Sequence, residues 1–303
     1  MTAPGAEALR AVEAEWRPEP VAQTETIIAR PSIALAGVFD QPSPVAGDGD
    51  PLPPLWHWLH FLELPATSEL GEDGHPKSGP FLPEYPRRRR MFGGARLRVR
   101  APLRVGQTVT RDSRVASVTF KEGRSGAMLF VTVEHRFSAD GAELCVEEQD
   151  IVYRQDPEPG SGPAVAPAAA RAGAPAPAAP GQEGPKPDWR WSLDPTEVLL
   201  FQFSALTYNA HRIHHDYPYV TQVEGFPGLV VHGPLSALGL LELPRQAGVE
   251  IASFEFRARK PLYAGTPVEF TGVRPGGGAG DRAELTAFNA HTPGAVTGSV
   301  ELA

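Results

Sequence analysis

An internal repeat constrains this chain more than any other feature of its sequence. The segment LRVRAPLRVGQTV at residues 97–109 and the segment FRARKPLYAGTPV at residues 256–268 share six identical residues at a constant offset of 159 positions. Each copy alternates apolar with polar side chains and then contains a Pro-Leu-x-x-Gly turn, a pattern typical of a strand that reverses into the next strand. The chain is therefore predicted to consist of two related halves.

A second pair of similar segments predicts one helix in each half. PLWHWLHFLEL begins at Pro54 and PLSALGLLEL begins at Pro234, and both place a proline at the first helical position before leucines at helical spacing. Alternating runs rich in Val, Thr and Phe predict strands at 107–117, 127–137, 143–153, 267–273, 282–290 and 295–302. The expected fold class is α+β, with two long central helices that are each wrapped by a curved antiparallel sheet.

The composition of one internal segment separates the two halves. Of the 32 residues from Asp156 to Pro187, 24 are Ala, Pro or Gly, and such a segment has almost no large side chain to bury. A length of 303 residues is itself typical of about two domains. We therefore expect an N-terminal domain at 1–155, a linker at 156–187 and a C-terminal domain at 188–303.

Charge and cysteine content exclude several classes of protein. The net charge of −8 provides no basic field for nucleic acid or for an anionic membrane surface. The apolar stretch from Phe226 to Leu241 is interrupted and too short to span a bilayer, which takes about 20 residues, and no secretion signal is visible. A single cysteine, Cys145, excludes an internal disulfide, so we expect a reducing, cytoplasmic location.

The candidate chemistry lies in the second half. A helix is predicted to start with Asp194 as its N-cap and to lead into TYNAHRIHHD at 207–216, where three of the nine histidines fall within five positions. This cluster has three interpretations: a polar loop that satisfies backbone groups, a metal site that uses His211 and His214, or a general acid/base site. In the third, which we favour, one imidazole moves a proton while the amide of Asn209 holds a water or a carbonyl.

A second cluster supports the acid/base interpretation. In GFPGLVVHGP at 225–234, Pro234 starts the predicted helix, so the Gly233 N–H lies at a helix N-terminus that favours an anion. Such a donor could stabilise negative charge that develops on a thioester oxygen. Neither a G-x-S-x-G nucleophile nor a nucleotide-binding glycine motif is present, and Cys145 lies in a strand-like run as an expected packed thiol.

These segments together resemble the MaoC-like hydratases and dehydratases. The likeness is greatest to the double-hotdog branch that includes hydroxyacyl-thioester dehydratase type 2 and the mesaconyl-C4-CoA or itaconyl-CoA hydratases, and it extends from about Thr24 to Ala303 without the linker. In the wider family the segment reads D-x-N-P-(I/L)-H. Its histidine matches His214, but its aspartate position holds Asn209.

The resemblance implies reversible hydration of a 2-enoyl-CoA, or dehydration of a 3-hydroxyacyl-CoA. It assigns proton transfer to His214, positioning of water to Asn209 and the oxyanion donor to the Gly233 N–H, with no metal or redox cofactor. Four further side chains are candidates for contacting an acyl-CoA substrate: Tyr208, His211, Arg212 and His232. Arg212 could pair with the carboxylate of a C4 or C5 dicarboxylic acyl group, or it could form a structural ion pair.

The front half has no equivalent histidine segment, so one active site per chain is expected, with the front half shaping the acyl or CoA channel. The arginines at 87–90 could clamp the phosphates of coenzyme A, or they could lie in a solvated loop. Two other functions stay open, namely a hotdog acyl-CoA thioesterase and a non-catalytic acyl-CoA-binding module. A homodimer of double-hotdog chains is compatible with the resemblance.

Overall fold

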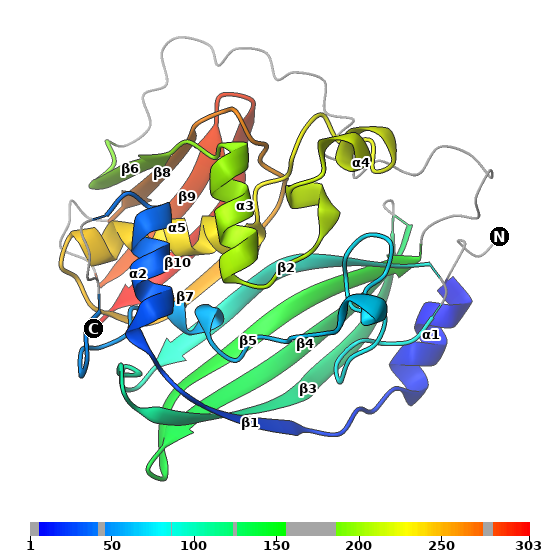
Figure 1. Cartoon of the computed structure of the whole chain (residues 1–303), viewed down its shortest axis with the longest axis horizontal. Coiled ribbons are helices and arrows are strands. Elements are labelled where there is room, and N and C mark those ends of the chain that lie inside the picture. The colour runs from blue at the N-terminus through cyan, green and yellow to red at the C-terminus, as the bar shows by residue number, and fades with distance from the viewer. Residues whose placement is uncertain (1–5, 42–45, 86, 124–125, 156–185, 275–280) are drawn as a thin grey trace.

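The computed structural model describes residues 6–41, 46–85, 87–123, 126–155, 186–274 and 281–303. Within these residues the chain forms one antiparallel sheet in the order β1-β3-β4-β5-β2-β7-β10-β9-β8-β6 (Figure 1). The front half contributes β1 (Val21–Thr26), β2 (Arg88–Val99), β3 (Thr108–Gly123), β4 (Gly126–Ala139) and β5 (Ala142–Gln155). The rear half contributes β6 (Trp189–Leu193), β7 (Ile251–Ala258), β8 (Val268–Val273), β9 (Arg282–Asn289) and β10 (Thr292–Leu302).

The two copies of the repeat meet at the centre of this sheet. Strands β2 and β7 pair antiparallel, and Arg96 stands opposite Glu255, which is its own equivalent 159 positions further along the chain. A local two-fold axis therefore passes through this pair. The predicted turns also form, because Gly106 and Gly265 both adopt positive φ angles, of 89° and 78°, which favour glycine. The repeat and the six predicted strands are confirmed.

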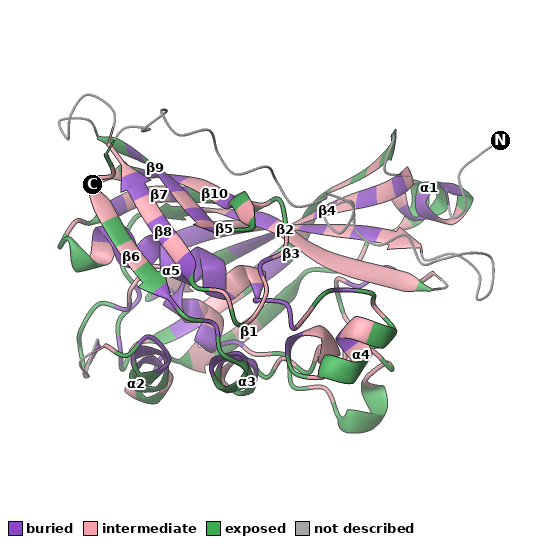
Figure 2. Ribbon diagram, turned by 90° about the horizontal axis from the view of Figure 1, so that it is seen from above, coloured by how far each residue is buried: buried purple, intermediate pink, exposed green. Residues whose placement is uncertain are grey.

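The helices of the two halves differ in number and position. Figure 2 shows α2 (Ala29–Val38), α3 (Glu197–Leu206) and α4 (Tyr217–Gln222) on the same side of the sheet, with α2 and α3 packed against each other. The buried helix α5 (Gly233–Gln246) contacts all five rear strands. The short helix α1 (Ala6–Glu15) contacts β3 and β4. The rear half therefore has one buried helix packed against its strands.

The long helix predicted at Pro54 does not form, and this prediction is wrong. The segment makes only a single 3-10 turn, η1 (Trp56–Leu59), between Leu55 and Phe61, whose φ angles are positive. A buried carboxylate on β5 explains the difference, because Glu147 accepts hydrogen bonds from His57 Nε2 at 2.6 Å and from Trp58 Nε1 at 2.8 Å. An unpaired buried carboxylate would be costly, so these polar contacts outweigh the helical preference of the segment.

Glu147 is held in its ionised form by the same contacts. Burial raises the pKa of the Glu147 carboxyl, but the hydrogen bond and charge of His57 outweigh it and keep the pKa below its usual value. Gln149 Nε2 donates a third hydrogen bond to this carboxylate at 2.8 Å. The front half therefore has a cluster of polar side chains around Glu147 on one face of its sheet. In the rear half, α5 covers the equivalent face.

Three smaller expectations concern the start of α3, the linker and Cys145. The N-cap of α3 is Thr196 rather than Asp194, because the Thr196 hydroxyl accepts the hydrogen bond from the Leu199 N–H at 3.2 Å. Of the expected linker at 156–187, residues 156–185 lie outside the described residues. Cys145 is buried, as expected of a packed thiol, and burial raises the pKa of this thiol.

The junction of the two halves gives a stability prediction. A Cβ atom at Gly94 would overlap the backbone oxygen of Phe256 on β7, and Gly94 also has a positive φ. We expect Gly94→Ala to lower the free energy of unfolding by about 2 kcal/mol or more. Gly123→Ala is the matched control, because no atom lies within 4 Å of its added Cβ. Urea denaturation measures both, and equal stability of the two variants would contradict the account.

Candidate active site

The histidine segment forms a compact loop between α3 and α5. After α3 ends, the chain passes through Tyr208, which has a positive φ, and makes the 3-10 turn η4 (Arg212–His214). Asn209 orders the start of this turn, because its Oδ1 accepts the His211 N–H at 3.0 Å. At the other end, the Val230 N–H donates to the Ile213 backbone oxygen at 2.9 Å. The clusters at 207–216 and 225–234 are therefore held together, as expected.

His214 is fixed in one orientation and faces the cavity of the protein. Its Nδ1 lies 2.7 Å from the backbone oxygen of Val230, which can only accept, so Nδ1 carries the proton and Nε2 keeps its lone pair. Burial lowers the pKa of His214 to about 4, and the charges of His75 and His215 act in the same direction. At neutral pH this side chain is an uncharged base.

His232 lies behind His214 rather than along the cavity, unlike the expectation that it contacts substrate. The two rings stack with centroids 3.7 Å apart, and His232 Nε2 lies 2.9 Å from the Ser204 hydroxyl. His232 is only 1% exposed, and burial holds the pKa of its imidazole well below the usual value. His232 therefore supports the ring of His214 through packing.

Gly233 begins α5 and lines the same cavity as His214 and Asn209. Its N–H is one of the first donors of the helix, and it has no acceptor within the part of the chain that the structure describes. A Cβ at this position would lie 3.6 Å from the ring of Phe92 on β2. The N-terminus of α5 thus presents a free donor to the cavity, next to β2, the front-half strand that pairs with the rear half.

The cavity has a volume of about 610 Å³ and continues into the front half. On the rear side it is lined by the histidine segment and the start of α5. On the front side it is lined by aromatic and polar residues that include Trp58, Phe61, Phe137 and Glu147. Because no long helix covers this part of the front sheet, space is available next to η1. A cavity of this volume, lined by both halves, can take a flexible chain.

The remaining predicted contacts divide into two groups. Tyr208 and His211 line the cavity. Arg212 does not, because its Nε and Nη2 both donate to Asp216, its Nη1 donates to the Glu72 backbone oxygen, and its guanidinium lies 4.0 Å from the centre of the Tyr219 ring. This arrangement favours the alternative of a structural ion pair for Arg212.

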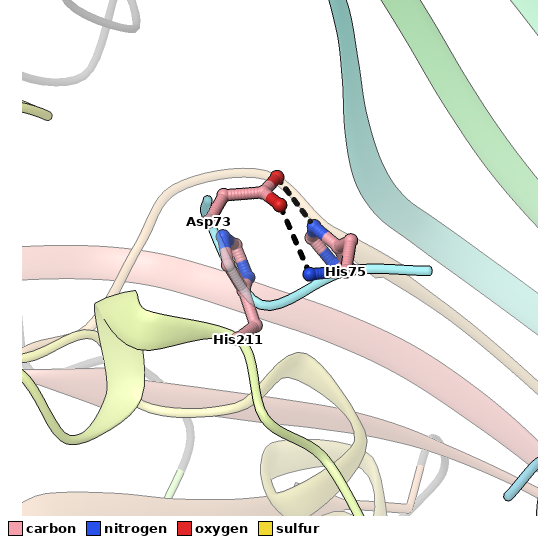
Figure 3. A group of neighbouring side chains, drawn as sticks. All are labelled: Asp73, His75 and His211. Carbon is pink, nitrogen blue, oxygen red and sulfur yellow. Dashed lines mark hydrogen bonds and ion pairs between the residues drawn. The ribbon is translucent and has the colours of Figure 1, made fainter. Parts of the chain in front are cut away.

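Sequence reasoning missed two residues of the site, Asp73 and His75, which lie in a front-half loop without a repeat equivalent. Asp73 Oδ2 lies 3.0 Å from His75 Nδ1, and the rings of His75 and His211 face each other with centroids 3.9 Å apart (Figure 3). The possible ligand atoms of these three residues lie within 4.8 Å of one another. The planes of the two imidazole rings are tilted by 36° to each other. The alternative metal pair, His211 and His214, has perpendicular rings with centroids 5.4 Å apart.

A second cavity of about 400 Å³ adjoins the first and is basic. Its lining includes four basic residues, Lys77, Arg87, Arg88 and Arg90, against two acidic ones, Asp73 and Glu84. It shares His75, Pro76 and Arg90 with the larger cavity. Arg88 is the first residue of β2 and donates to the backbone oxygens of Pro76, Lys77 and Pro83, so it holds the cavity wall. Arg89 instead pairs with Glu224. Most of the predicted arginine cluster therefore lies on a strand rather than in a loop.

Comparisons with known proteins agree with this architecture. Residues 55–264 match the family of hydroxyacyl-thioester dehydratase type 2. The chain is 43% identical over 272 residues to mesaconyl-C(4)-CoA hydratase from Chloroflexus aurantiacus, with 89% of this chain and 91% of that protein covered.

Two solved structures from Mycobacterium tuberculosis show the fold. HtdX superposes with a TM-score of 0.60 at 15% identity, covering 94% of this chain and all of that chain. A protein described as having a double hotdog fold superposes with a TM-score of 0.54 at 13% identity, covering 96% of this chain and 97% of that chain. Within the described residues, no helix is long and apolar enough to cross a membrane.

The buried imidazoles predict how stability depends on pH. Burial lowers the pKa of His135 and of His214 from 6.5 to about 4 each. Below pH 6.5 the unfolded chain therefore binds protons that the folded chain does not, so stability is lost as the pH falls from 6.5 toward 4, by about 1.4 kcal/mol per pH unit for each imidazole.

Urea denaturation at pH 7 and pH 5 measures this loss. We expect His214→Gln to reduce the difference in unfolding free energy between the two pH values. The control His291→Gln, at an exposed residue, should leave the difference unchanged. Equal stability of the parent protein at both pH values would contradict the burial of neutral imidazoles.

Proposed function

The chain belongs to the hydroxyacyl-thioester dehydratase type 2 family, and from this premise we propose that it is a hydro-lyase that reversibly hydrates a 2-enoyl-CoA thioester. The observation that carries the proposal is the state of His214. This buried, uncharged imidazole has its Nδ1–H bound to Val230 and its Nε2 free at the wall of the cavity. A group of this kind can take a proton from water at neutral pH.

His214 exchanges a proton with the water that adds to C3, the β-carbon of the acyl group. In the hydration direction, Nε2 accepts a proton from water as the water oxygen forms a bond to C3. In the dehydration direction, the resulting imidazolium returns that proton to the departing hydroxyl. The Val230 oxygen stabilises the imidazolium through Nδ1, because a hydrogen bond to a charged donor is stronger than one to a neutral donor.

Gly233 and Asn209 act on the two oxygens of the reaction. Addition of water to C3 moves an electron pair toward the thioester oxygen, and the free N–H of Gly233 at the start of α5 donates to this developing charge. Asn209 lines the cavity, and its side-chain NH2 group positions the water, since its Oδ1 is held by the His211 N–H. Asn209 cannot act as a base, so His214 alone takes the proton of this water.

A short dicarboxylic acyl group is the substrate that the relative from Chloroflexus aurantiacus suggests. The cavity lining supports an anionic acyl-CoA, because it includes the basic residues Arg90, Arg259 and Lys260. Arg212 is already paired with Asp216 and is not assigned to the substrate carboxylate. The front half would hold the acyl group beside Trp58 and Phe61.

Coenzyme A would enter through the basic cavity. The phosphates of coenzyme A would lie near Lys77, Arg87 and Arg90, while the pantetheine passes His75 into the larger cavity. In this proposal Arg87 and Arg90 keep the role of a phosphate site, while Arg88 holds the cavity wall and Arg89 pairs with Glu224. Two adjoining cavities that share Arg90 provide the slot that a thioester on a long arm requires.

Removal of the proposed base gives the most direct kinetic prediction. We expect His214→Ala to lower kcat for hydration by roughly 10²- to 10⁴-fold with the fold retained. The control is His215→Ala, at the exposed neighbouring histidine, which should stay within about twofold of the parent. Loss of enoyl absorbance with crotonyl-CoA and mesaconyl-CoA measures the rate, and a free-thiol assay run in parallel detects thioester hydrolysis. Equal hydration rates of the parent and His214→Ala would refute the assignment.

The phosphate site predicts an effect on substrate binding alone. We expect Arg90→Ala to raise KM for an enoyl-CoA about tenfold, on the scale of one lost charge-assisted hydrogen bond of about 1.4 kcal/mol. The same enoyl group on N-acetylcysteamine, which has no phosphates, should show the same KM with the parent and with Arg90→Ala. Arg282→Ala is the control, at an exposed arginine on β9. If both thioesters lose affinity equally, Arg90 does not bind phosphate.

A further inference from the structure

The proposed mechanism uses one imidazole, yet hydration moves two protons. Water loses a proton when it bonds to C3, and C2 gains a proton when the enolate collapses. His214 is assigned to the first step. The position where the wider family has an aspartate holds Asn209, which cannot exchange a proton. The rear half therefore supplies one of the two groups that such chemistry uses.

The front half places a carboxylate and an imidazole in the same cavity. Asp73 and His75 lie in the loop 70–77, which is closed by the hydrogen bond from the Gly71 N–H to the His75 oxygen at 2.7 Å and by a bridge between Leu70 and Pro76. His75 lines the larger cavity together with His211 and His214. The loop is therefore an ordered wall of the site.

The loop is also docked closely against the histidine segment. The Arg212 N–H donates to the Asp73 backbone oxygen at 2.8 Å, and a Cβ at Gly74 would overlap the backbone oxygen of Ala210. Gly74 also has a positive φ of 86°, so only glycine allows this approach without strain. The close fit fixes the distance between His75 and the rear-half histidines.

The hydrogen bonds of His75 match those of His214. Each imidazole has its Nδ1 next to an oxygen acceptor, Val230 for His214 at 2.7 Å and Asp73 for His75 at 3.0 Å, so each keeps Nε2 for other partners. Asp73 is itself oriented, because its Oδ1 accepts the His75 N–H at 2.9 Å. Burial raises the pKa of the Asp73 carboxyl, but hydrogen bonding to His75 outweighs it and keeps the pKa below its usual value. A carboxylate that orients an imidazole in this way also stabilises its charged form.

We propose that His75, positioned by Asp73, is the second proton-transfer group of the active site and exchanges the proton of C2. This inference rests on the proposed hydro-lyase function. In hydration, the water oxygen bonds to C3 and its proton passes to His214 Nε2, while the alkene electron pair moves onto the thioester oxygen. The enolate then takes a proton from Nε2 of the His75 imidazolium to form the C2–H bond. His214 releases its proton, and His75, whose side chain is 22% exposed, regains one from water.

The test uses a substitution that preserves the loop and changes only the chemistry. In Asp73→Asn, the amide oxygen can still accept the His75 N–H, but the amide NH2 faces His75 Nδ1, so the imidazole must carry its proton on Nε2. We expect kcat to fall about 10- to 100-fold with KM changed less than threefold. For His75→Gln we expect a fall of about 10²-fold or more. Glu72→Gln is the matched control, because it removes an exposed negative charge one residue away and should leave kcat unchanged.

An isotope effect separates a chemical role from a structural one. The probe is 3-hydroxybutyryl-CoA with both C2 hydrogens replaced by deuterium, assayed in the dehydration direction. If His75 removes the C2 proton, Asp73→Asn slows that step, so the deuterium isotope effect on kcat increases relative to the parent protein. A fall in kcat with an unchanged isotope effect, or no fall in kcat at all, would overturn the proposal. Absence of any turnover by the parent protein would instead reject the proposed function itself.

Discussion

The hydrogen-bonded pairing of β2 with β7 joins two copies of one strand into a single sheet, and the rest of the molecule depends on it. Because Arg96 stands opposite its own equivalent Glu255, the two halves are related by a local two-fold axis. The pairing brings Phe92 of the front half next to Gly233 of the rear half. A cavity lined by both halves follows from this geometry, and neither half could form it alone.

The two halves have diverged around this axis in complementary ways. The rear half keeps its buried helix α5 and places His214 and the Gly233 N–H at one end of it. The front half has a single 3-10 turn where that helix would lie, and it organises the turn around the buried carboxylate of Glu147. Burial of this charge costs several kcal/mol, which three hydrogen bonds offset. The space left by the absent helix becomes the front part of the cavity.

The sequence was sufficient to predict features that arise from local patterns. The repeat predicted a strand in each of the two segments that form β2 and β7, alternation predicted β3 to β5 and β8 to β10, and the spacing after Pro234 predicted α5. The prediction of a helix at Pro54 failed because the conformation of that segment depends on its hydrogen bonds to Glu147, about 90 residues away. The spacing of leucines contains no information about that contact. The pair of Asp73 and His75 was missed for a similar reason. Its loop has no periodicity and no equivalent in the repeat, and only tertiary packing brings it to His211.

The charge and tautomer of His214 are the centre of this account, and nitrogen NMR of the protein with 15N-labelled histidine measures both directly. His214→Gln identifies the signals by their disappearance. At pH 7 we predict a neutral ring with its proton on Nδ1, bound to Val230, and an unprotonated Nε2. A ring protonated on both nitrogens at pH 7, or a neutral ring with its proton on Nε2, would contradict the role of His214 as the base that takes a proton from water.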